Sequence, residues 1–278
     1  MIDDKCFMID VPPTSSLSFQ MIQHSPELHG SDEVVYFQFE SLLREQGLMH
    51  AVFGRHGGAS DPPFSSLNTS YSTGDDADRV RRNLSTVMKV MGGENLLYMN
   101  QIHGREVLVL HGKVPSHFRQ GAQADAVITD RKNLILMVKQ ADCQGILFYD
   151  PTTRVIAAAH CGWRGNVLNI LGSVVERMVL EFGCSRARLI AAIGPSLGPC
   201  CAEFIGYPKI FPRSFRSSMV RENYFDLWRI SRLQLLEAGL VEENIEVAGV
   251  CTVCRTDLFF SYRAEKTTGR FATAIMLT

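Results

Sequence analysis

The chain has 278 residues, of which 46% are hydrophobic, enough to bury the core of one large domain or two small ones. Its 28 basic and 29 acidic side chains nearly cancel, which argues against a nucleic-acid-binding surface. No stretch approaches the ~20 apolar residues that span a membrane, and Asp3 and Asp4 stand where a secretory signal needs positive charge. We therefore expect a cytoplasmic protein whose eight cysteines are buried thiols, metal ligands or nucleophiles, not a disulfide framework.

The first part of the chain divides at residue 50. Residues 1–50 are predicted to form an N-terminal extension with a short strand and a short helix, since Pro12-Pro13 and a Ser-rich stretch make its start irregular. Residues 51–278 are predicted to form a single domain, because no linker is visible. This domain opens with an apolar run at 51–53 and a loop rich in Pro, Ser, Asn and Gly at 60–76. A helix is then predicted to run up to Gly92-Gly93, from residues with helical spacing, namely Val80, Leu84, Val87, Met88 and Met91.

Beyond Gly93 the pattern changes to short runs rich in β-formers. These runs predict strands at 96–99, 107–110, 126–129, 134–138, 146–149 and 155–159. A long helix over 166–182, a strand at 189–193, a second amphipathic helix at 227–238 and closing strands at 247–250, 258–262 and 271–276 complete the chain. Hairpins mixed with crossover helices predict an α/β or α+β fold, with a mixed sheet and helices packed outside.

One predicted hairpin brings two chemically active residues together. Asp150-Pro151-Thr152-Thr153 is a good four-residue turn. If Tyr149 pairs with Arg154, the same register sets Cys143 opposite His160, with Cβ atoms ~4.5–5.5 Å apart on one face. A sulfur and an imidazole at that separation suit one zinc ion. A buried cysteine beside a hydrogen-bonded histidine is the alternative interpretation.

The flanks of this pair favour an accessible site. Asp142 precedes the cysteine, and Cys161-Gly162-Trp163-Arg164-Gly165 follows the histidine, a polar and Gly-rich context typical of an exposed strand end. The N-terminus of the predicted long helix opens nearby, so its free N–H groups and Arg164 are candidates to hold an anion. His103, at the junction of two strands, is a candidate third ligand among eight histidines. Two His and one Cys would leave a fourth position open, as in catalytic zinc sites, and copper also suits these ligands.

These blocks and others in the same order resemble the laccase-domain family. The family is also called the multicopper polyphenol oxidase or YfiH family, and its members are now regarded as purine nucleoside phosphorylases. The resemblance covers about Ala51 to the C-terminus. The matching blocks include Gly57-Gly58, Pro63-Phe64-Ser65-Ser66-Leu67-Asn68, Gly74-Asp75-Asp76, Asn100-Gln101-Ile102-His103-Gly104, Ala141-Asp142-Cys143, Ala159-His160-Cys161-Gly162-Trp163-Arg164-Gly165, Ile193-Gly194-Pro195, Gly198-Pro199-Cys200-Cys201, Phe259-Phe260-Ser261-Tyr262-Arg263 and Thr268-Gly269-Arg270.

The resemblance implies a catalytic laccase-type domain with a metal held by His103, Cys143 and His160. It implies phosphorolysis of adenosine, inosine and methylthioadenosine, and deamination of adenosine. The substrates would be a purine nucleoside and phosphate, with zinc as the expected metal, and a monomer or homodimer as the assembly. The implied fold is a layered α/β arrangement, similar to the catalytic domain of cytotoxic necrotizing factor toxins, in which a Cys and a His act without metal.

Three further residues are candidates for binding substrate. The family places a basic residue near the substrate at Arg55, and a guanidinium can bind phosphate bidentately. We therefore predict that Arg55, with Arg164, binds phosphate. Asn68 either orders its loop or contacts the ribose. The sequence departs from the family pattern in Lys139-Gln140, Gln144-Gly145 and Arg263-Ala264, which would alter the shape of the pocket.

Alternative functions remain open at this point. A copper polyphenol oxidase needs several copper ions and clustered histidines, and eight scattered histidines fit it poorly. A metal-free cysteine hydrolase would use Cys143 as nucleophile and His160 as base. Elsewhere, Cys251-Thr252-Val253-Cys254 with Cys200-Cys201 is either a four-cysteine zinc site, a redox pair or a group of buried thiols.

Overall fold

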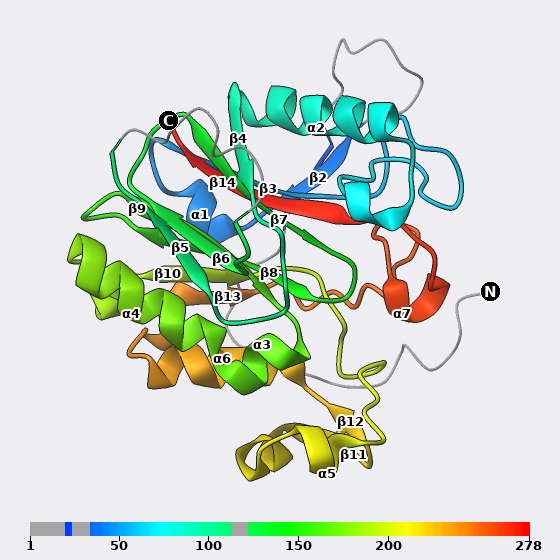
Figure 1. Ribbon diagram of the computed structural model, residues 1–278. Coiled ribbons are helices and arrows are strands. Elements are labelled where there is room, and N and C mark those ends of the chain that lie inside the picture. Colours follow the sequence, from blue (N-terminus) through cyan, green and yellow to red (C-terminus); the bar gives the residue numbers. More distant parts are fainter. Residues whose placement is uncertain (1–19, 24–33, 113–121) are drawn as a thin grey trace.

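The computed structural model describes residues 20–23, 34–112 and 122–278, and the proline-rich start of the expected extension lies outside them. Two six-stranded mixed sheets pack against each other (Figure 1). The first has the order β1 (Gln20–Gln23), β2 (Val35–Gln38), β3 (Leu48–Phe53), β14 (Phe271–Leu277), β7 (Leu134–Gln140), β4 (Asn95–Tyr98). The second has the order β13 (Ile245–Val247), β10 (Ile190–Ile193), β8 (Gln144–Asp150), β9 (Val155–Cys161), β6 (Ala126–Thr129), β5 (Val107–Leu110). The predicted α/β class with layered mixed sheets is confirmed.

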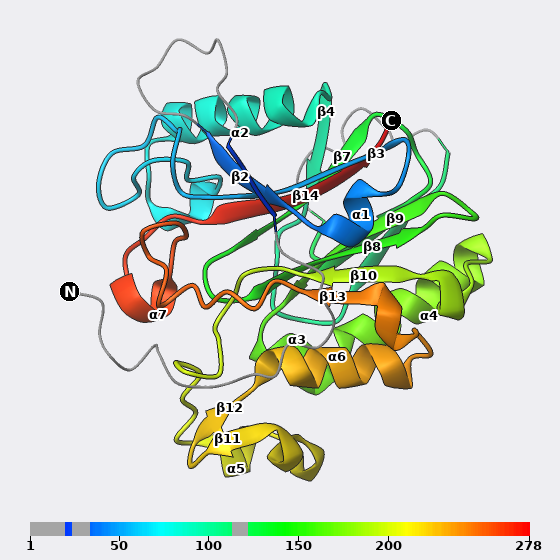
Figure 2. The same cartoon turned by 180° about the vertical axis from the view of Figure 1, so that it is seen from behind.

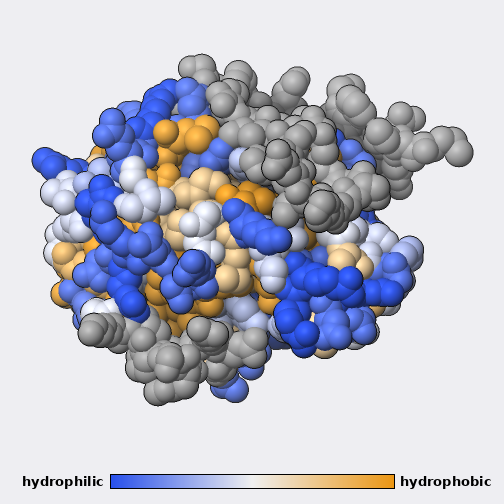
Figure 3. Space-filling view, turned by 90° about the horizontal axis from the view of Figure 1, so that it is seen from above, coloured by the Kyte–Doolittle hydropathy of each residue, from blue (hydrophilic) through white to orange (hydrophobic). Residues whose placement is uncertain are grey.

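Helices cover the outer face of each sheet. α2 (Ala77–Met91) lies over the first sheet, and α4 (Ile170–Phe182) and α6 (Leu227–Glu237) lie over the second (Figures 1 and 2). α2 begins at the Asp76 carboxylate, which accepts hydrogen bonds from two backbone N–H groups at 3.0 Å, and ends at Gly92 with φ of 70°. Seen from the α2 side, hydrophilic residues flank a more apolar strip on the surface (Figure 3).

Both faces of the central strands are buried, which explains their almost continuous apolar sequences. In β7, Leu136 and Val138 face the layer between the two sheets, while Ile135 and Met137 pack under α2. β8 alternates in the same way between the inter-sheet layer and the side covered by α4 and α6. The result is a four-layer molecule, helix–sheet–sheet–helix.

Three predicted elements are wrong. The long helix over 166–182 is two helices, α3 (Trp163–Leu168) and α4, because Asn169 adopts φ of 53° and its side chain caps α4 at Gly172 N, 3.2 Å away. The strand at 247–250 is instead β13 at 245–247, and Gly249, with φ of 63°, lies in the irregular segment beyond it. The run at 258–262 forms no strand: Phe259, Phe260 and Ser261 are buried, and the chain continues into α7 (Tyr262–Glu265), which begins with the exposed Tyr262.

The remaining described elements are short. β2 leads into α1 (Glu40–Leu43), and β2 pairs with β3 across the division expected at residue 50. α5 (Tyr207–Ile210) and the β11–β12 hairpin (Met219–Arg221 and Tyr224–Phe225) project at the bottom of Figure 1 around an aromatic cluster. Among the described residues, every helix is too short or too polar to cross a bilayer.

Candidate metal centre and active-site cavity

His103, Cys143 and His160 meet where strands of the two sheets end. His103 follows β4, Cys143 lies between β7 and β8, and His160 is in β9. Their ligand atoms all lie within 4.8 Å of one another, and the two imidazole rings are 4.9 Å apart, edge to face. His160 is buried, Cys143 half-buried and His103 exposed, so the cluster is open to one side. These three residues, which the sequence singled out, are called the candidate metal centre below.

The hairpin that carries two of these residues has a different register from the predicted one. Asp150 pairs with Val155, so the turn is Pro151–Arg154, one residue later than expected. The Asp150 carboxylate accepts hydrogen bonds from two backbone N–H groups within this turn, and Arg154 closes it with φ of 54°. His160 therefore opposes Gly145, and Cys143 is its diagonal neighbour two residues away. The partner of His160 is thus two positions along β8 from the predicted one. Because side chains alternate with a period of two, Cys143 and His160 still lie on the same face and meet.

A buried carboxylate orients the two histidines. Asp125 is fully buried, and its Oδ1 lies 2.9 Å from Nδ1 of His160. The same carboxylate accepts hydrogen bonds from the backbone N–H groups of His103 (3.0 Å) and Gly104 (2.7 Å). Nδ1 of His160 thus donates its proton to Asp125, and Nε2 faces Cys143. Asp125 was not among the predicted site residues; its signal in the sequence is an acid placed directly before a buried apolar strand.

The charges in the cluster depend strongly on one another. Burial opposes ionisation of Cys143, but the charge of His160 and hydrogen bonds with both histidines lower the pKa of Cys143 to about 6. Burial also opposes the imidazolium of His160, but the Cys143 thiolate and Asp125 raise the pKa of His160 to about 9. Without a metal, Cys143 and His160 therefore each stabilise the charged form of the other. One thiolate and two imidazoles, with a hydrogen-bonded carboxylate behind them, are a donor set that fits zinc.

The candidate metal centre lies in the wall of a cavity of about 850 Å³, a volume typical of small-molecule sites. Aromatic side chains and three cationic ones share this wall. The aromatic residues are Tyr71, Tyr98, Trp163, Phe204 and Tyr262, and the cationic ones are Lys139, Arg263 and Arg270. An apolar, aromatic enclosure with a few charged groups suits a planar heterocycle attached to a polar or anionic group.

The three cations differ in how firmly they are already held. Arg263 donates a hydrogen bond to the Glu203 carbonyl at 3.0 Å, and one nitrogen of Arg270 donates to the carbonyls of Thr268 and Gly269, both at 2.9 Å. Lys139 has its Nζ 4.1 Å from the centre of the Tyr98 ring, and burial lowers the pKa of Lys139 to about 8. Lys139 and Arg270 thus offer a partly desolvated positive charge to an anion in the cavity.

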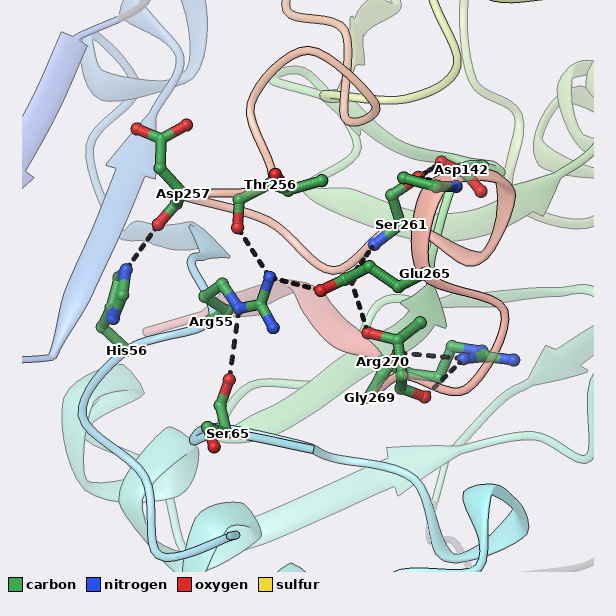
Figure 4. A network of polar contacts seen from close by, with 12 residues as sticks. Arg55, His56, Ser65, Asp142, Thr256, Asp257, Ser261, Glu265, Gly269 and Arg270 are labelled. Atoms are coloured by element: carbon green, nitrogen blue, oxygen red, sulfur yellow. Dashed lines mark hydrogen bonds and ion pairs between the residues drawn. The ribbon is translucent and has the colours of Figure 1, made fainter. Parts of the chain in front are cut away.

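The structure does not bring Arg55 to the cavity. Its guanidinium forms an ion pair with Glu265 at 3.0 Å and donates to the carbonyls of Thr256 (2.6 Å) and Ser65 (3.1 Å) (Figure 4). The side chain is only 14% exposed and also lies over the ring of Phe260. Nε and Nη1 of the guanidinium predicted to bind phosphate therefore bind Ser65 and the loop that carries α7.

The other two predicted substrate residues are also placed away from the cavity. Asn68 is fully buried and orders its loop: its Oδ1 accepts from the backbone N–H groups of Ser70 (3.1 Å) and Arg270 (2.9 Å). Asn68 thereby orders its loop and holds the backbone of Arg270, which lines the cavity; it does not line the cavity itself. Arg164 is exposed, with its guanidinium 5.1 Å from the ring of Trp163. Trp163 itself lines the cavity.

Known proteins are similar to this chain in sequence and in fold. The chain is 34% identical to the purine nucleoside phosphorylase of Bacteroides thetaiotaomicron, over 86% of this chain and 95% of that protein. It is 32% identical to the purine nucleoside phosphorylase YlmD of Geobacillus stearothermophilus, over 81% of this chain and 88% of that protein. The crystal structure of YfiH from Bacillus licheniformis superposes with a TM-score of 0.79 at 28% identity, covering 87% of this chain and 96% of that one.

Fold and cavity together define a layered α/β enzyme. Residues 49–278 match the family described as multi-copper polyphenol oxidoreductase laccase, and the chain belongs to this family, whose curated relatives at about 30% identity are named purine nucleoside phosphorylases.

Proposed function

We propose that the protein is a zinc-dependent phosphorylase that cleaves adenosine, inosine and methylthioadenosine with phosphate, and that it also deaminates adenosine. The observation that carries this proposal is the position of the candidate metal centre in the wall of an aromatic cavity that also contains Lys139 and Arg270. A purine base and a phosphate are the two chemical groups that such a wall accommodates best.

Different residues of the chain bind the purine base and the phosphate. Aromatic side chains such as Trp163 and Tyr262 stack on the purine and exclude water from the glycosidic bond. Lys139 and Arg270 hold phosphate against the ribosyl carbon, where they stabilise the charge that develops as the bond breaks. His103, Cys143 and His160 would hold the zinc, which supplies Lewis-acid polarisation of the substrate when bound.

A phosphate titration of a Lys139→Met variant tests this assignment. Loss of one charge-assisted hydrogen bond to phosphate costs about 1.5–3 kcal/mol, or about 10–100-fold in phosphorolysis at subsaturating phosphate. Deamination uses no phosphate, so inosine formation from adenosine in phosphate-free buffer should change far less. Adenine and inosine are separated by chromatography, and Lys89→Met on α2 is the matched control. Equal loss of both products would show that Lys139 orients the nucleoside instead.

The copper oxidase in the family's description fits this site less well. Oxidation of phenols with dioxygen needs several copper ions held by clustered histidines. Within the described part of the chain, the two groups able to hold a metal contain only two histidines between them, His103 and His160. Adding Cu²⁺ to the metal-free protein and measuring oxygen consumption with a phenol tests this directly.

A second candidate follows from one specific observation, the line from Cys143 through His160 to Asp125. A thiolate beside an imidazolium that a carboxylate orients is the arrangement of a cysteine hydrolase. The two functions are separated by metal dependence. A phosphorylase that uses zinc loses activity on chelation and regains it with Zn²⁺, whereas a thiol hydrolase gains reactivity when the thiolate is freed.

A further inference from the structure

Four cysteines outside the candidate metal centre bring their sulfur atoms together. The Sγ atoms of Cys200, Cys201, Cys251 and Cys254, here called the four-cysteine cluster, all lie within 4.8 Å of one another. Those of Cys200 and Cys201 are 3.6 and 3.7 Å from that of Cys254. Four zinc–sulfur bonds of about 2.3 Å in a tetrahedron put the sulfurs about 3.8 Å apart. The cluster therefore already has nearly the spacing of ligands around one ion.

The topology of the second sheet explains why two distant sequence segments meet here. β10 and β13 are parallel neighbours, so their carboxyl ends lie at the same edge. The segments that follow them stay paired through a parallel bridge between Ser196 and Cys251. One segment then delivers Cys200 and Cys201. The other delivers Cys251 and Cys254 in a turn closed by a 3.0 Å hydrogen bond from Arg255 N to the Cys251 carbonyl.

The cluster has three features of a built site for an ion bound by sulfur. The backbone N–H of Gly198 donates to Cys251 Sγ at 3.4 Å, a contact that favours a thiolate. A Cβ at Gly198 would lie 2.8 Å from the Cys251 Cβ and 2.9 Å from the ring of Trp228, so only glycine permits this approach. Trp228 and neighbouring apolar side chains pack around the cysteines, which limits solvent access as in closed structural zinc sites.

We propose that the four-cysteine cluster binds one zinc ion as a structural site in the reduced protein. Cys254 is disulfide-bonded in the structure, so the fourth thiolate ligand forms on reduction. Thiolates are the ligands that select zinc among the common divalent ions, and four of them leave no open coordination position. The proposed zinc ion therefore has a structural role: it cross-links the segments that follow β10 and β13 and takes no part in the chemistry in the cavity.

The zinc ion in the four-cysteine cluster would connect two segments that contribute to the wall of the cavity. Leu197 from the first segment and Arg263 beyond the second both line the cavity. Both also bind Asp142, the residue before Cys143: Leu197 N donates to its carbonyl at 2.8 Å and Arg263 N to its carboxylate at 2.5 Å. An ion between the two segments thus fixes the surroundings of the candidate metal centre without contacting the substrate.

Metal counting on protein purified under reducing conditions with zinc in the medium tests the proposal. We expect two zinc ions per chain in the wild type, one in Cys143→Ala and one in Cys251→Ser. Cys184→Ser is the matched control, because Cys184 is a buried cysteine outside both groups, and it should keep two. In Cys143→Ala, Co²⁺ replacing the remaining zinc should show the sulfur-to-cobalt charge-transfer bands of four thiolates.

A thiol assay keeps the proposal testable if Cys251→Ser does not fold. Zinc added to reduced Cys143→Ala should protect four thiols from a thiol reagent, and a chelator should expose them again. One zinc per wild-type chain that disappears in Cys143→Ala, with no thiols protected by added zinc, would overturn the second site. That outcome leaves the proposed phosphorylase untouched, because it concerns only the four-cysteine cluster.

Discussion

Replacement of Asp125 by Asn should weaken zinc binding because it changes the proton that His160 carries. One carboxylate oxygen accepts from His103 N and His160 Nδ1, and the other accepts from the N–H groups of Ile102 (3.2 Å) and Gly104. An amide NH₂ in either position faces two donors and loses both hydrogen bonds. If it faces His160, Nδ1 must accept and the proton moves to Nε2, where it blocks the metal.

The magnitude follows from these contacts. Two lost hydrogen bonds to a charged, buried acceptor cost roughly 3–6 kcal/mol of folding free energy, at about 1.5–3 kcal/mol each. Loss of an orienting partner behind a metal-ligating histidine typically costs about 10–100-fold in metal affinity. The Asn side chain is isosteric, so neither effect arises from a cavity.

Two measurements separate stability from metal binding. Urea unfolding of the metal-free protein gives the first, and competition with a chromophoric zinc chelator gives the second. Asp76→Asn is the matched control, because Asp76 caps α2 at the surface and asparagine caps a helix equally well. Zinc affinity equal to that of the wild type in Asp125→Asn, with Cys143→Ala unable to bind zinc at that centre, would refute the orienting role of the carboxylate.

Three further substitutions probe the surroundings of the site. Gly162→Ala should weaken zinc binding and activity with little loss of stability, because the new Cβ would lie 2.7 Å from Cys143 Sγ in an ordinary extended backbone; unchanged zinc affinity by chelator competition would contradict this. His50 accepts a backbone hydrogen bond at 2.7 Å, and burial lowers its pKa to about 3. Its unfolded form takes up a proton below about pH 6.5, so stability should fall by about 2 kcal/mol between pH 7.5 and pH 5, and His50→Gln should lack this part of the slope in urea titrations. Arg55→Met should destabilise the fold by about 2–4 kcal/mol, since it leaves Glu265 without its ion-pair partner, while the KM for phosphate stays unchanged. A raised KM at normal stability would return Arg55 to the phosphate site.

The strands of the two sheets were predictable because burial on both faces leaves a strong signal. Ala126–Thr129, buried throughout, has the predicted bounds. The edge strand Val107–Leu110 is only partly buried but also has the predicted bounds, because its four residues are all apolar. The break at Asn169 was not predictable from the same signal, since apolar residues with helical spacing continue across it. Only the left-handed backbone of a single residue divides the two helices, and an Asn side chain merely permits that conformation.

The grouping of His103, Cys143 and His160 could be predicted from the sequence, whereas the cations that line the cavity could not, for a physical reason. A metal site needs specific donor atoms, so the residue types of Cys143 and His160 are enough to mark them as candidate ligands. A cation on a Gly-rich loop can bind either a ligand or a neighbouring carboxylate. Arg55 binds the carboxylate of Glu265, which lies more than 200 residues further along the chain, and the sequence does not show that the two are close. Lys139 was visible as a departure from the family pattern, but its place in the cavity wall depends on the pairing of β7 in the sheet.

Two carboxylates hold the backbone of the candidate metal centre in an uncommon conformation. His103 and Asp142 both have left-handed φ, 57° and 77°, which costs roughly 1–3 kcal/mol for each non-glycine residue. Asp125 stabilises the first by accepting the N–H of His103. Asp142 stabilises its own turn, because its carboxylate accepts from Thr252 Oγ1 at 2.8 Å and Ser261 Oγ at 2.7 Å. The chain is thus fixed on both sides of the centre by carboxylates, the buried Asp125 and the half-buried Asp142, and not by a metal. A centre organised in this way is assembled before any ion arrives, so metal-free protein should keep the fold and rebind zinc without refolding.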